Sequence, residues 1–206
     1  PETLLTDDYD SAFYSEWLDS FYARDIQELF SVRNRQAFMQ LMRFILLNSG
    51  GMLELTQLSK HCMIARQTVI SYIESLRIAN FLYLVPPFFG GGKREITHRP
   101  KCYGFDTGFV CFVKGWNEIR EDDQGILWEH LVLDALRTYS KYGTVFYWRD
   151  ISGKEIDFVV KNSINEIDIY ECKIKPEHFS AGHFKIFRNI YPEGMNYCVC
   201  PNIREP

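Results

Sequence analysis

Charged residues on two neighbouring predicted strands have the types and the spacing of a divalent-cation site. In the strand predicted over residues 155–161, alternation places Ile156, Phe158 and Val160 on one face and Asp157 on the other. On the next strand, Glu171 and Lys173 are two positions apart and therefore share a face. Carboxylates on adjacent strands supply the hard oxygen ligands that Mg²⁺ or Mn²⁺ prefers. The pattern predicts a metal site at Asp157 and Glu171.

A further acid, Glu129, is expected to point towards this site from a helix. It lies on the same helical stripe as the apolar residues three, four and seven positions later (Val132, Leu133 and Leu136). The next residue, His130, is expected on the outward face. An inward carboxylate costs several kcal/mol unless it is paired or bound to a metal. The position of Glu129 therefore favours a third ligand of the metal site.

The elements that must hold these residues form an α/β arrangement in the last part of the chain. The patterns predict helices over 126–141 and 179–189 and strands over 144–149, 155–161, 166–175 and 197–200. Residues 117–123 are polar and acidic, as expected of a boundary. We therefore predict two domains, over residues 1–115 and 116–206.

The first domain is predicted to contain a winged helix-turn-helix. Helices are expected over 11–30 and 35–48, and then a short helix with Thr56 at its N-cap. A break at Met63-Ile64-Ala65 precedes a second helix that begins at Arg66, which is typical of a helix-turn-helix. Strands predicted over 81–85 and 101–106 flank the basic, glycine-rich loop 90–94, which is expected to form the wing.

Charge is segregated along the chain in a way that favours nucleic-acid binding by the middle third. The net charge is −4 overall, but residues 48–114 carry eight basic against four acidic side chains, a net charge of +4. Glu74, on the exposed face of the second helix, opposes contact with DNA. The candidate nucleic-acid-binding residues are Lys60, Arg66, Gln67, Lys93, Arg94, Arg99, Lys101, Arg149 and Lys154.

Two alternatives remain open at this point. Glu and Lys often pair across the solvated face of a strand, so the Asp157, Glu171 and Lys173 pattern also arises without catalysis. The winged helix is also compatible with a module that packs against other protein domains. The loop 90–94 lacks the spacing of a phosphate-binding loop, so ATP is expected only in a domain upstream of this chain.

Short motifs recur along the chain in an order that matches a known family. They are Tyr22-Ala23-Arg24-Asp25-Ile26, Gln67-Thr68-Val69 to Leu76, Pro100-Lys101, Asp106-Thr107-Gly108, Gly125 with Glu129, Tyr147-Trp148-Arg149, Glu155-Ile156-Asp157-Phe158 and Glu171-Cys172-Lys173. On these motifs the chain is similar to the domain of unknown function 4143, which follows the ATPase module of many bacterial and archaeal AAA+ proteins, and its last part resembles the PD-(D/E)xK nuclease core. One departure is Met63-Ile64-Ala65, where the family has a Gly-Val-Ser-like turn, so the second helix lacks a hydroxyl cap.

The resemblance implies roles for the site residues. Asp157 and Glu171, with the Cys172 carbonyl, would bind Mg²⁺ or Mn²⁺, and Glu129 would complete the site or hold a second ion. Lys173 would orient or deprotonate the attacking water. The implied fold class is α+β or α/β, with N-terminal helices and a winged helix-turn-helix followed by a restriction-endonuclease-like αβββαβ domain. The implied function is DNA binding with metal-dependent phosphodiester hydrolysis beside an upstream ATPase; the alternative is a non-catalytic DNA- or protein-binding module that regulates this ATPase.

Composition excludes several other classes. With 46% hydrophobic and 24% charged residues, the chain is neither disordered nor fibrous. Six cysteines lie scattered without a C-x-x-C pair, which favours reduced thiols in a cytoplasmic protein and disfavours structural zinc. No apolar run is long enough for a membrane span. Because Pro1 is not followed by a signal pattern, a piece of a longer protein is expected. The sequence leaves the choice between a monomer and a homo-oligomer open.

Overall fold

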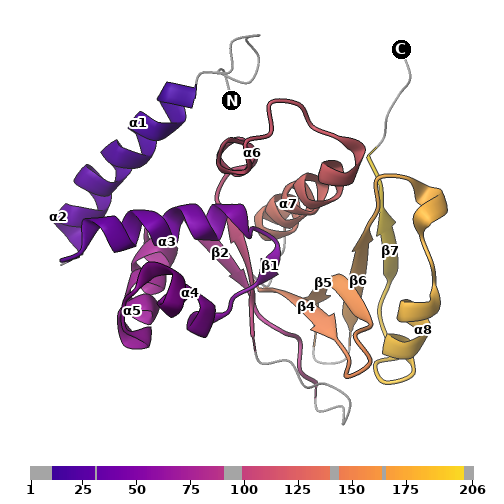
Figure 1. Ribbon diagram of the computed structural model, residues 1–206. Helices are drawn as coiled ribbons and strands as arrows, with labels where there is room; N and C mark the ends of the chain where they lie inside the picture. Colours follow the sequence, from indigo (N-terminus) through magenta and orange to yellow (C-terminus); the bar gives the residue numbers. More distant parts are fainter. Residues whose placement is uncertain (1–10, 31, 91–98, 140–143, 164–165, 202–206) are drawn as a thin grey trace. The chain divides into compact units, whose positions relative to one another are not determined.

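A computed structural model describes residues 11–30, 32–90, 99–139, 144–163 and 166–201 (Figure 1). The fold is α+β, as predicted. Contacts divide the chain into two compact units, Pro1–Leu84 with Cys102–Ile119 and Val85–Lys101 with Arg120–Pro206. The segment Val85–Lys101, which the sequence places in the winged helix, therefore groups with the C-terminal unit.

The N-terminal unit has the topology of a winged helix. The order α3, β1, α4, α5, β2, β3 and the three-stranded sheet with order β1-β3-β2 confirm this part of the predicted fold. α1 and α6 are added to this core and contact each other. The elements are α1 (Ser11–Phe21), the π-helical η2 (Tyr22–Ile26), α2 (Gln27–Leu29), α3 (Arg35–Leu47), β1 (Gly51–Met52), α4 (Leu55–Cys62), α5 (Arg66–Ile78), β2 (Leu82–Val85), β3 (Lys101–Gly104) and α6 (Thr107–Lys114).

The turn of the helix-turn-helix lies where the sequence predicts it. α4 ends at Met63, which has the left-handed conformation with φ of 51°. The Ser59 hydroxyl donates to the Ile64 carbonyl at 2.6 Å and closes the turn. Ala65 makes no capping hydrogen bond from its side chain, so the absence of a hydroxyl cap is confirmed. At the other end of α4 the N-cap is Glu54, and the prediction of Thr56 as N-cap was wrong.

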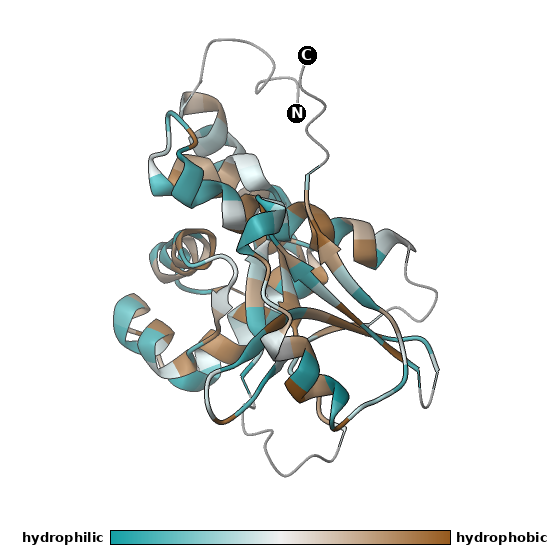
Figure 2. Ribbon diagram, turned by 90° about the vertical axis from the view of Figure 1, so that its right-hand side faces the viewer, coloured by the Kyte–Doolittle hydropathy of each residue, from teal (hydrophilic) through white to brown (hydrophobic). Residues whose placement is uncertain are grey.

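Aromatic side chains from distant parts of the sequence fill the core of this unit. The Trp17 ring stacks on Phe21 and on Phe105, with centroids 5.2 and 5.0 Å apart. Phe81 and Phe109 extend the same cluster from either side of β3 in sequence. The helices combine apolar and polar residues, as Figure 2 shows by brown and teal, because one stripe of each packs inwards. The aromatic residues of α1 therefore attach this helix to the winged helix.

The C-terminal unit is a four-stranded sheet between two helices (Figure 1). The sheet order is β4-β5-β6-β7, in which only β6 and β7 are parallel. α7 contacts β4 and β6, whereas α8 contacts β5. This confirms the predicted αβββαβ order. The elements are α7 (Glu121–Tyr139), β4 (Val145–Arg149), β5 (Glu155–Lys161), β6 (Ile167–Cys172), the short 3₁₀-helix η3 (Pro176–His178), α8 (Gly182–Arg188) and β7 (Asn196–Val199).

A register shift between β4 and β5 changes the faces that simple alternation predicts. Phe146 pairs with Val159 and Trp148 pairs with Ile156, so Tyr147 alone stands opposite two residues, Asp157 and Phe158. Such a β-bulge twists the strand and re-aims a side chain. As a result, Ile156 and Val159 share one apolar cluster with α8, and the predicted alternation of residues 156, 158 and 160 was wrong.

The stripe of α7 that packs inwards also differs from the predicted one. Val132 and Leu133 are buried as expected, but His130 is only 3% exposed and Glu129 is half-buried. The buried stripe runs through Leu127, His130 and Leu133, so the prediction of an outward His130 was wrong. None of the described helices, α7 included, combines the length and the apolar content needed to cross a membrane.

Candidate functional site

Asp157 lies on β5 and Glu171 on β6, which are adjacent antiparallel strands. The register pairs Phe158 with Tyr170 and Val159 with Ile169, and its continuation by one step brings Asp157 to the level of Glu171. Both residues are buried, with 9% and 7% exposure. The Cys172 amide donates to Asp157 Oδ2 at 2.8 Å and thereby fixes the carboxylate beside the end of β6. The predicted proximity of the two acids in the sheet is thus present.

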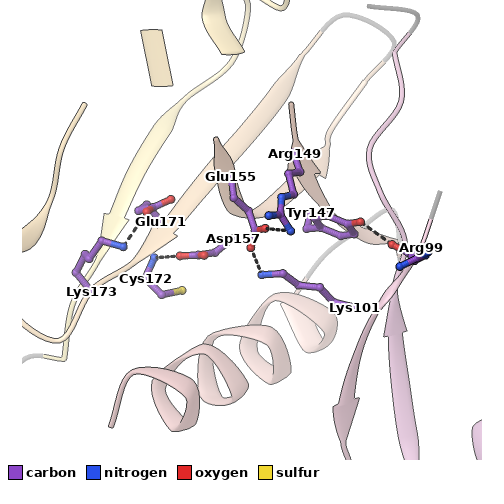
Figure 3. Close-up of polar contacts among 9 residues, drawn as sticks. All are labelled: Arg99, Lys101, Tyr147, Arg149, Glu155, Asp157, Glu171, Cys172 and Lys173. Carbon is purple, nitrogen blue, oxygen red and sulfur yellow. Dashed lines mark hydrogen bonds and ion pairs between the residues drawn. The ribbon is translucent and has the colours of Figure 1, made fainter. Parts of the chain in front are cut away.

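Lys173 pairs with Glu171, as its position two residues later predicts. Its Nζ lies 2.7 Å from Glu171 Oε1 (Figure 3). Burial lowers the pKa of the Lys173 ammonium, but the hydrogen bond and the negative charge of Glu171 outweigh this, so the pKa lies above its ordinary value. Lys173 is therefore held in the charged form next to the two acids.

The Asp157 carboxyl has a raised pKa. Burial is the largest cause, because a desolvated carboxylate is less stable than the neutral acid. The positive charges of Lys101 and Lys173 and the Cys172 amide oppose this shift without cancelling it. A buried carboxyl at a β-bulge, with a raised pKa and two lysines nearby, is the kind of group found at functional sites.

Glu129 approaches the same site from α7. Burial raises the pKa of the Cys172 thiol, and the charges of Asp157, Glu129 and Glu171 raise it further, in that order. These three carboxylates are therefore close enough to the Cys172 side chain to act on its pKa. The structure thus brings together the four residues that the sequence assigns to catalysis, namely Asp157, Glu171, Lys173 and Glu129.

Lys101 also belongs to this site, and the sequence analysis missed this role. It is predicted to contact phosphate, but it is only 5% exposed and its Nζ lies 2.5 Å from Glu155 Oε1. The Tyr147 ring lies beneath the ammonium, with its centroid at 5.7 Å (Figure 3). A lysine at the start of a strand carries no periodic signal for burial. Its ion-pair partner is an acid of β5, and a further acid acts on it from α7. Both acids are remote in sequence, so no local pattern identifies them.

Other predicted nucleic-acid-binding residues are distributed over both units. Lys60, Arg66 and Gln67 are exposed on α4 and α5. Arg99 and Lys154 are exposed in the C-terminal unit, where the Tyr147 hydroxyl donates to the Arg99 carbonyl. Arg149 is half-buried, with its Nη1 3.8 Å from Glu155 Oε2. Lys93 and Arg94 lie outside the described residues.

The charge of Glu74 on α5 is compensated. Arg77 donates to both carboxylate oxygens of Glu74, at 2.9 and 2.6 Å. This bidentate pair lowers the pKa of the Glu74 carboxyl, chiefly through the hydrogen bond. The acid that opposes DNA contact in the sequence analysis therefore carries its own counter-charge.

Comparisons with known proteins identify two matching families. Residues 1–120 match the family described as Domain of unknown function (DUF8612), and residues 124–205 match Domain of unknown function (DUF4143). The predicted resemblance to the latter is confirmed over 124–205, whereas the first part of the chain matches a different family model.

Similar proteins occur in mycobacteria. The chain is 27% identical over 167 residues to uncharacterized protein Rv2008c of Mycobacterium tuberculosis and to uncharacterized protein Mb2031c of Mycobacterium bovis. The match covers 78% of this chain and 37% of each relative, so the chain spans little more than a third of their length. A solved structure, the transcriptional regulator SlyA, matches with a TM-score of 0.29 and 19% identity over 64% of this chain and 79% of that chain. The winged-helix assignment therefore rests on the topology of the chain itself.

Proposed function

Because the chain belongs to the family described as Domain of unknown function (DUF8612), its function has to be inferred from its own geometry, and we propose that it binds DNA and hydrolyses phosphodiester bonds with the help of a divalent cation. The observation that carries the proposal is the hydrogen bond from the Cys172 amide to Asp157, which fixes this acid next to the strand end where Lys173 lies 2.7 Å from Glu171. Two acids and one amine on adjacent strands match the chemistry that the nuclease resemblance implies.

The donor set fits Mg²⁺ or Mn²⁺. Mg²⁺ keeps several of its waters and is commonly held by one or two carboxylates. Asp157 and Glu171 would supply these carboxylates, and the Cys172 carbonyl would add a further oxygen. Among the described residues, no three His, Cys, Asp or Glu side chains form a cluster that could hold a metal. We therefore assign the ion to these two acids and to water, and leave Glu129 outside its ligands.

The residues of the chain then have separate tasks. When bound, the cation supplies Lewis acidity that activates water and offsets the charge of the transition state. Asp157 is oriented by the Cys172 amide at 2.8 Å, so its free orientations are restricted before the substrate arrives. Lys173, kept charged by Glu171, donates a hydrogen bond to a phosphate oxygen or to the attacking water and so orients it.

The winged helix would supply DNA binding. In helix-turn-helix proteins the second helix enters the major groove. Here that helix is α5, with Arg66, Gln67 and Ser71 exposed and with Glu74 neutralised by Arg77. We also propose an ATPase module as the partner in a longer chain. The resemblance to the C-terminal family of AAA+ proteins supports this, and relatives more than twice as long as this chain leave room for it.

A cleavage assay tests the proposal. Plasmid and single-stranded DNA are incubated with Mg²⁺ or Mn²⁺ and the wild type, Asp157→Asn, Lys173→Ala or the exposed control Lys175→Ala. We expect cleavage by the wild type and the control, and losses of about a hundredfold or more in the two site variants. Cleavage that survives both site substitutions identifies a contaminating nuclease, and the absence of cleavage by every form contradicts the proposal.

A second candidate is a non-catalytic DNA-binding module, and the position of Lys101 favours it. The buried Lys101 ammonium pairs with Glu155, and its positive charge also acts on Asp157. The acids therefore have a counter-charge without a metal ion. In this case the wild type shifts labelled DNA in a mobility assay, Arg66→Ala weakens the shift, and no metal supports cleavage. Because phosphate contacts release counterions, the affinity should fall as salt rises.

A further inference from the structure

Two neighbouring thiols lie at the edge of the C-terminal sheet. β7, which carries Cys198, is the last strand in the sheet order, and Cys200 is the first but one residue after Cys198, just beyond the end of the strand. Residues two positions apart on a strand share a face, and the sulfurs of this pair lie 3.8 Å apart. Cys198 is exposed and Cys200 is half-buried, so a reagent in solution reaches them.

The surroundings of the pair suit a small reagent. A groove of about 510 Å³ opens beside Cys198, lined among others by Phe184 and Lys185 of α8 and by Asn196 of β7. This volume is typical of a small-molecule site. The other four cysteines of the chain are buried, so a thiol reagent meets only this pair in the folded protein.

The residue between the two cysteines is in contact with the candidate site. The Val199 carbonyl accepts from the Lys173 amide at 3.1 Å and from Trp128 Nε1 at 2.8 Å. Cys198 itself pairs with Glu171 in the parallel register of β6 and β7. To form a disulfide, the sulfurs have to approach from 3.8 Å to the roughly 2.05 Å of an S–S bond. Val199 lies inside the small ring that this bond closes, so its backbone has to move.

We propose that Cys198 and Cys200 are a modification site, in which exchange with a low-molecular-weight disulfide forms a reversible Cys198–Cys200 disulfide that weakens the hydrogen bonds to the Val199 carbonyl. One cysteine thiolate attacks the small disulfide, forms a mixed disulfide and releases the first small thiolate. The other cysteine thiolate then attacks the protein sulfur of the mixed disulfide and releases the second one. The two cysteines lose two electrons and two protons, and the small disulfide takes them up as two thiols.

The modification is compatible with the reduced state expected in a cytoplasm. Intracellular disulfides are usually transient and redox-sensing, and exposed ones are the more easily reduced. The disulfide itself does not depend on the proposed function. Its effect on cleavage does, because it acts through the contacts of Val199 with Lys173 and with the helix that carries Trp128.

Peptide mapping tests the disulfide without DNA or metal. Reduced protein is incubated with oxidised glutathione for several hours, because burial and the hydrogen bond with Cys200 raise the pKa of the Cys198 thiol to about 11 and leave little thiolate. The remaining thiols are then alkylated and the peptides are analysed by mass spectrometry. We expect the peptide with both cysteines to lose two hydrogens and to carry no glutathione.

Single variants separate this product from simple adduct formation. Cys198→Ser and Cys200→Ser should each retain glutathione on the remaining cysteine, because the second step has no thiol. In the wild type, a peptide that is alkylated at both cysteines, carries only glutathione, or is linked to a second chain overturns the inference.

Nuclear magnetic resonance of nitrogen-15-labelled protein tests the effect on Val199. In the oxidised wild type we expect the signals of the Lys173 amide and the Trp128 indole to move, and the Lys173 amide to exchange with deuterium roughly fivefold faster. The Trp17 indole, in the N-terminal unit, is the internal reference and should not move. The variant Cys198→Ser with Cys200→Ser, treated in the same way, should show no change. Unchanged Lys173 and Trp128 signals in a protein that carries the disulfide overturn its effect on Val199.

A cleavage assay distinguishes this inference from the proposed function. Oxidation should lower the cleavage rate of the wild type several-fold, dithiothreitol should restore it, and the double serine variant should be insensitive to both treatments. Equal rates for the reduced and oxidised wild type overturn the control of cleavage. No cleavage by the reduced wild type contradicts the proposed function alone, since peptide mapping and magnetic resonance still decide the disulfide.

Discussion

Met63 holds a backbone conformation that side chains with a Cβ rarely adopt. It ends α4 with φ of 51°, and its side chain is 81% exposed. The left-handed conformation costs a non-glycine residue roughly 1 kcal/mol, and the exposed side chain offers little burial in return. Glycine is the usual residue at this place after a helix. The turn of the helix-turn-helix is therefore strained at one residue.

We expect Met63→Gly to stabilise the protein by about 0.5–1 kcal/mol. Relief of the strain outweighs the larger chain entropy of glycine in the unfolded state when φ is positive. The free energy of unfolding from urea denaturation measures the effect. Met195→Gly is the control, since Met195 is also exposed but is not among the described non-glycine residues with positive φ. A loss of stability in both variants would contradict this explanation.

At the scale of elements, one side chain ties α7 to the edge of the sheet. Trp128 Nε1 donates to the Val199 carbonyl at 2.8 Å, and this carbonyl also accepts from the Lys173 amide at 3.1 Å. The bond therefore links the helix that carries Glu129 to the strand beside Glu171. The Val199 carbonyl thus connects α7 and the residue after β6 through one acceptor.

Trp128→Phe should destabilise the protein by about 1–2 kcal/mol, because it removes one hydrogen bond and part of the packing of the half-buried indole. Thermal or urea unfolding measures the loss. Trp116→Phe is the control. Trp116 is half-buried, and the Lys114 ammonium lies 4.9 Å from the centroid of its ring. Phenylalanine retains this cation–π contact, so the expected change in the free energy of unfolding is within about 0.5 kcal/mol. Equal losses in the two variants would rule out a special role for the Val199 contact.

Elements with a clear period could be predicted from the sequence, and features that depend on distant neighbours could not. The spacing of Val69, Tyr72, Ile73 and Leu76 predicts α5, in which these four residues are all buried. In contrast, the bulge at Asp157 arises from pairing with β4, and no local pattern encodes it. α6 was also missed, although Asp106 accepts from the Gly108 and Phe109 amides and caps it. The sequence contains this capping residue, in the stretch Asp106-Thr107-Gly108 that matches the family motif, and a helix is predictable from it.

The candidate site shows the same division. The pairing of Glu171 with Lys173 follows from the period of two along a strand, whereas the position of Asp157 also depends on the bulge opposite Tyr147. The burial of His130 depends on the rotation of α7 about its own axis over the sheet. The apolar stripe predicts this rotation only to within one residue position. Lys101 depends on three acids from two other segments. Ion pairs between remote segments leave no trace in local periodicity.

At the scale of the whole molecule, the cysteines report on both units. Cys62, Cys102 and Cys111 are buried in the N-terminal unit, and Cys172 is buried in the C-terminal unit. Burial raises the pKa of the Cys102 thiol to about 12. Cys198 is exposed and Cys200 is half-buried, with their sulfurs 3.8 Å apart. Thiol accessibility therefore tests the packing of both units in one experiment.

We expect two of the six thiols, Cys198 and Cys200, to react with an alkylating agent in the folded protein, and the other four only after unfolding. Burial, followed by the hydrogen bond with Cys200, raises the pKa of the Cys198 thiol to about 11. The thiolate is the reactive form, and a higher pKa leaves less of it at a given pH. Labelling of Cys198 at pH 8 is therefore slower than that of a free cysteine. Its rate should rise about tenfold per pH unit until the pKa is reached. Peptide mapping by mass spectrometry identifies the labelled sites, and the variant Cys198→Ser with Cys200→Ser should show almost no labelling before denaturation. Rapid labelling of Cys172 would contradict the packing around Asp157, because this thiol lies among the carboxylates of the site and would then be open to solvent.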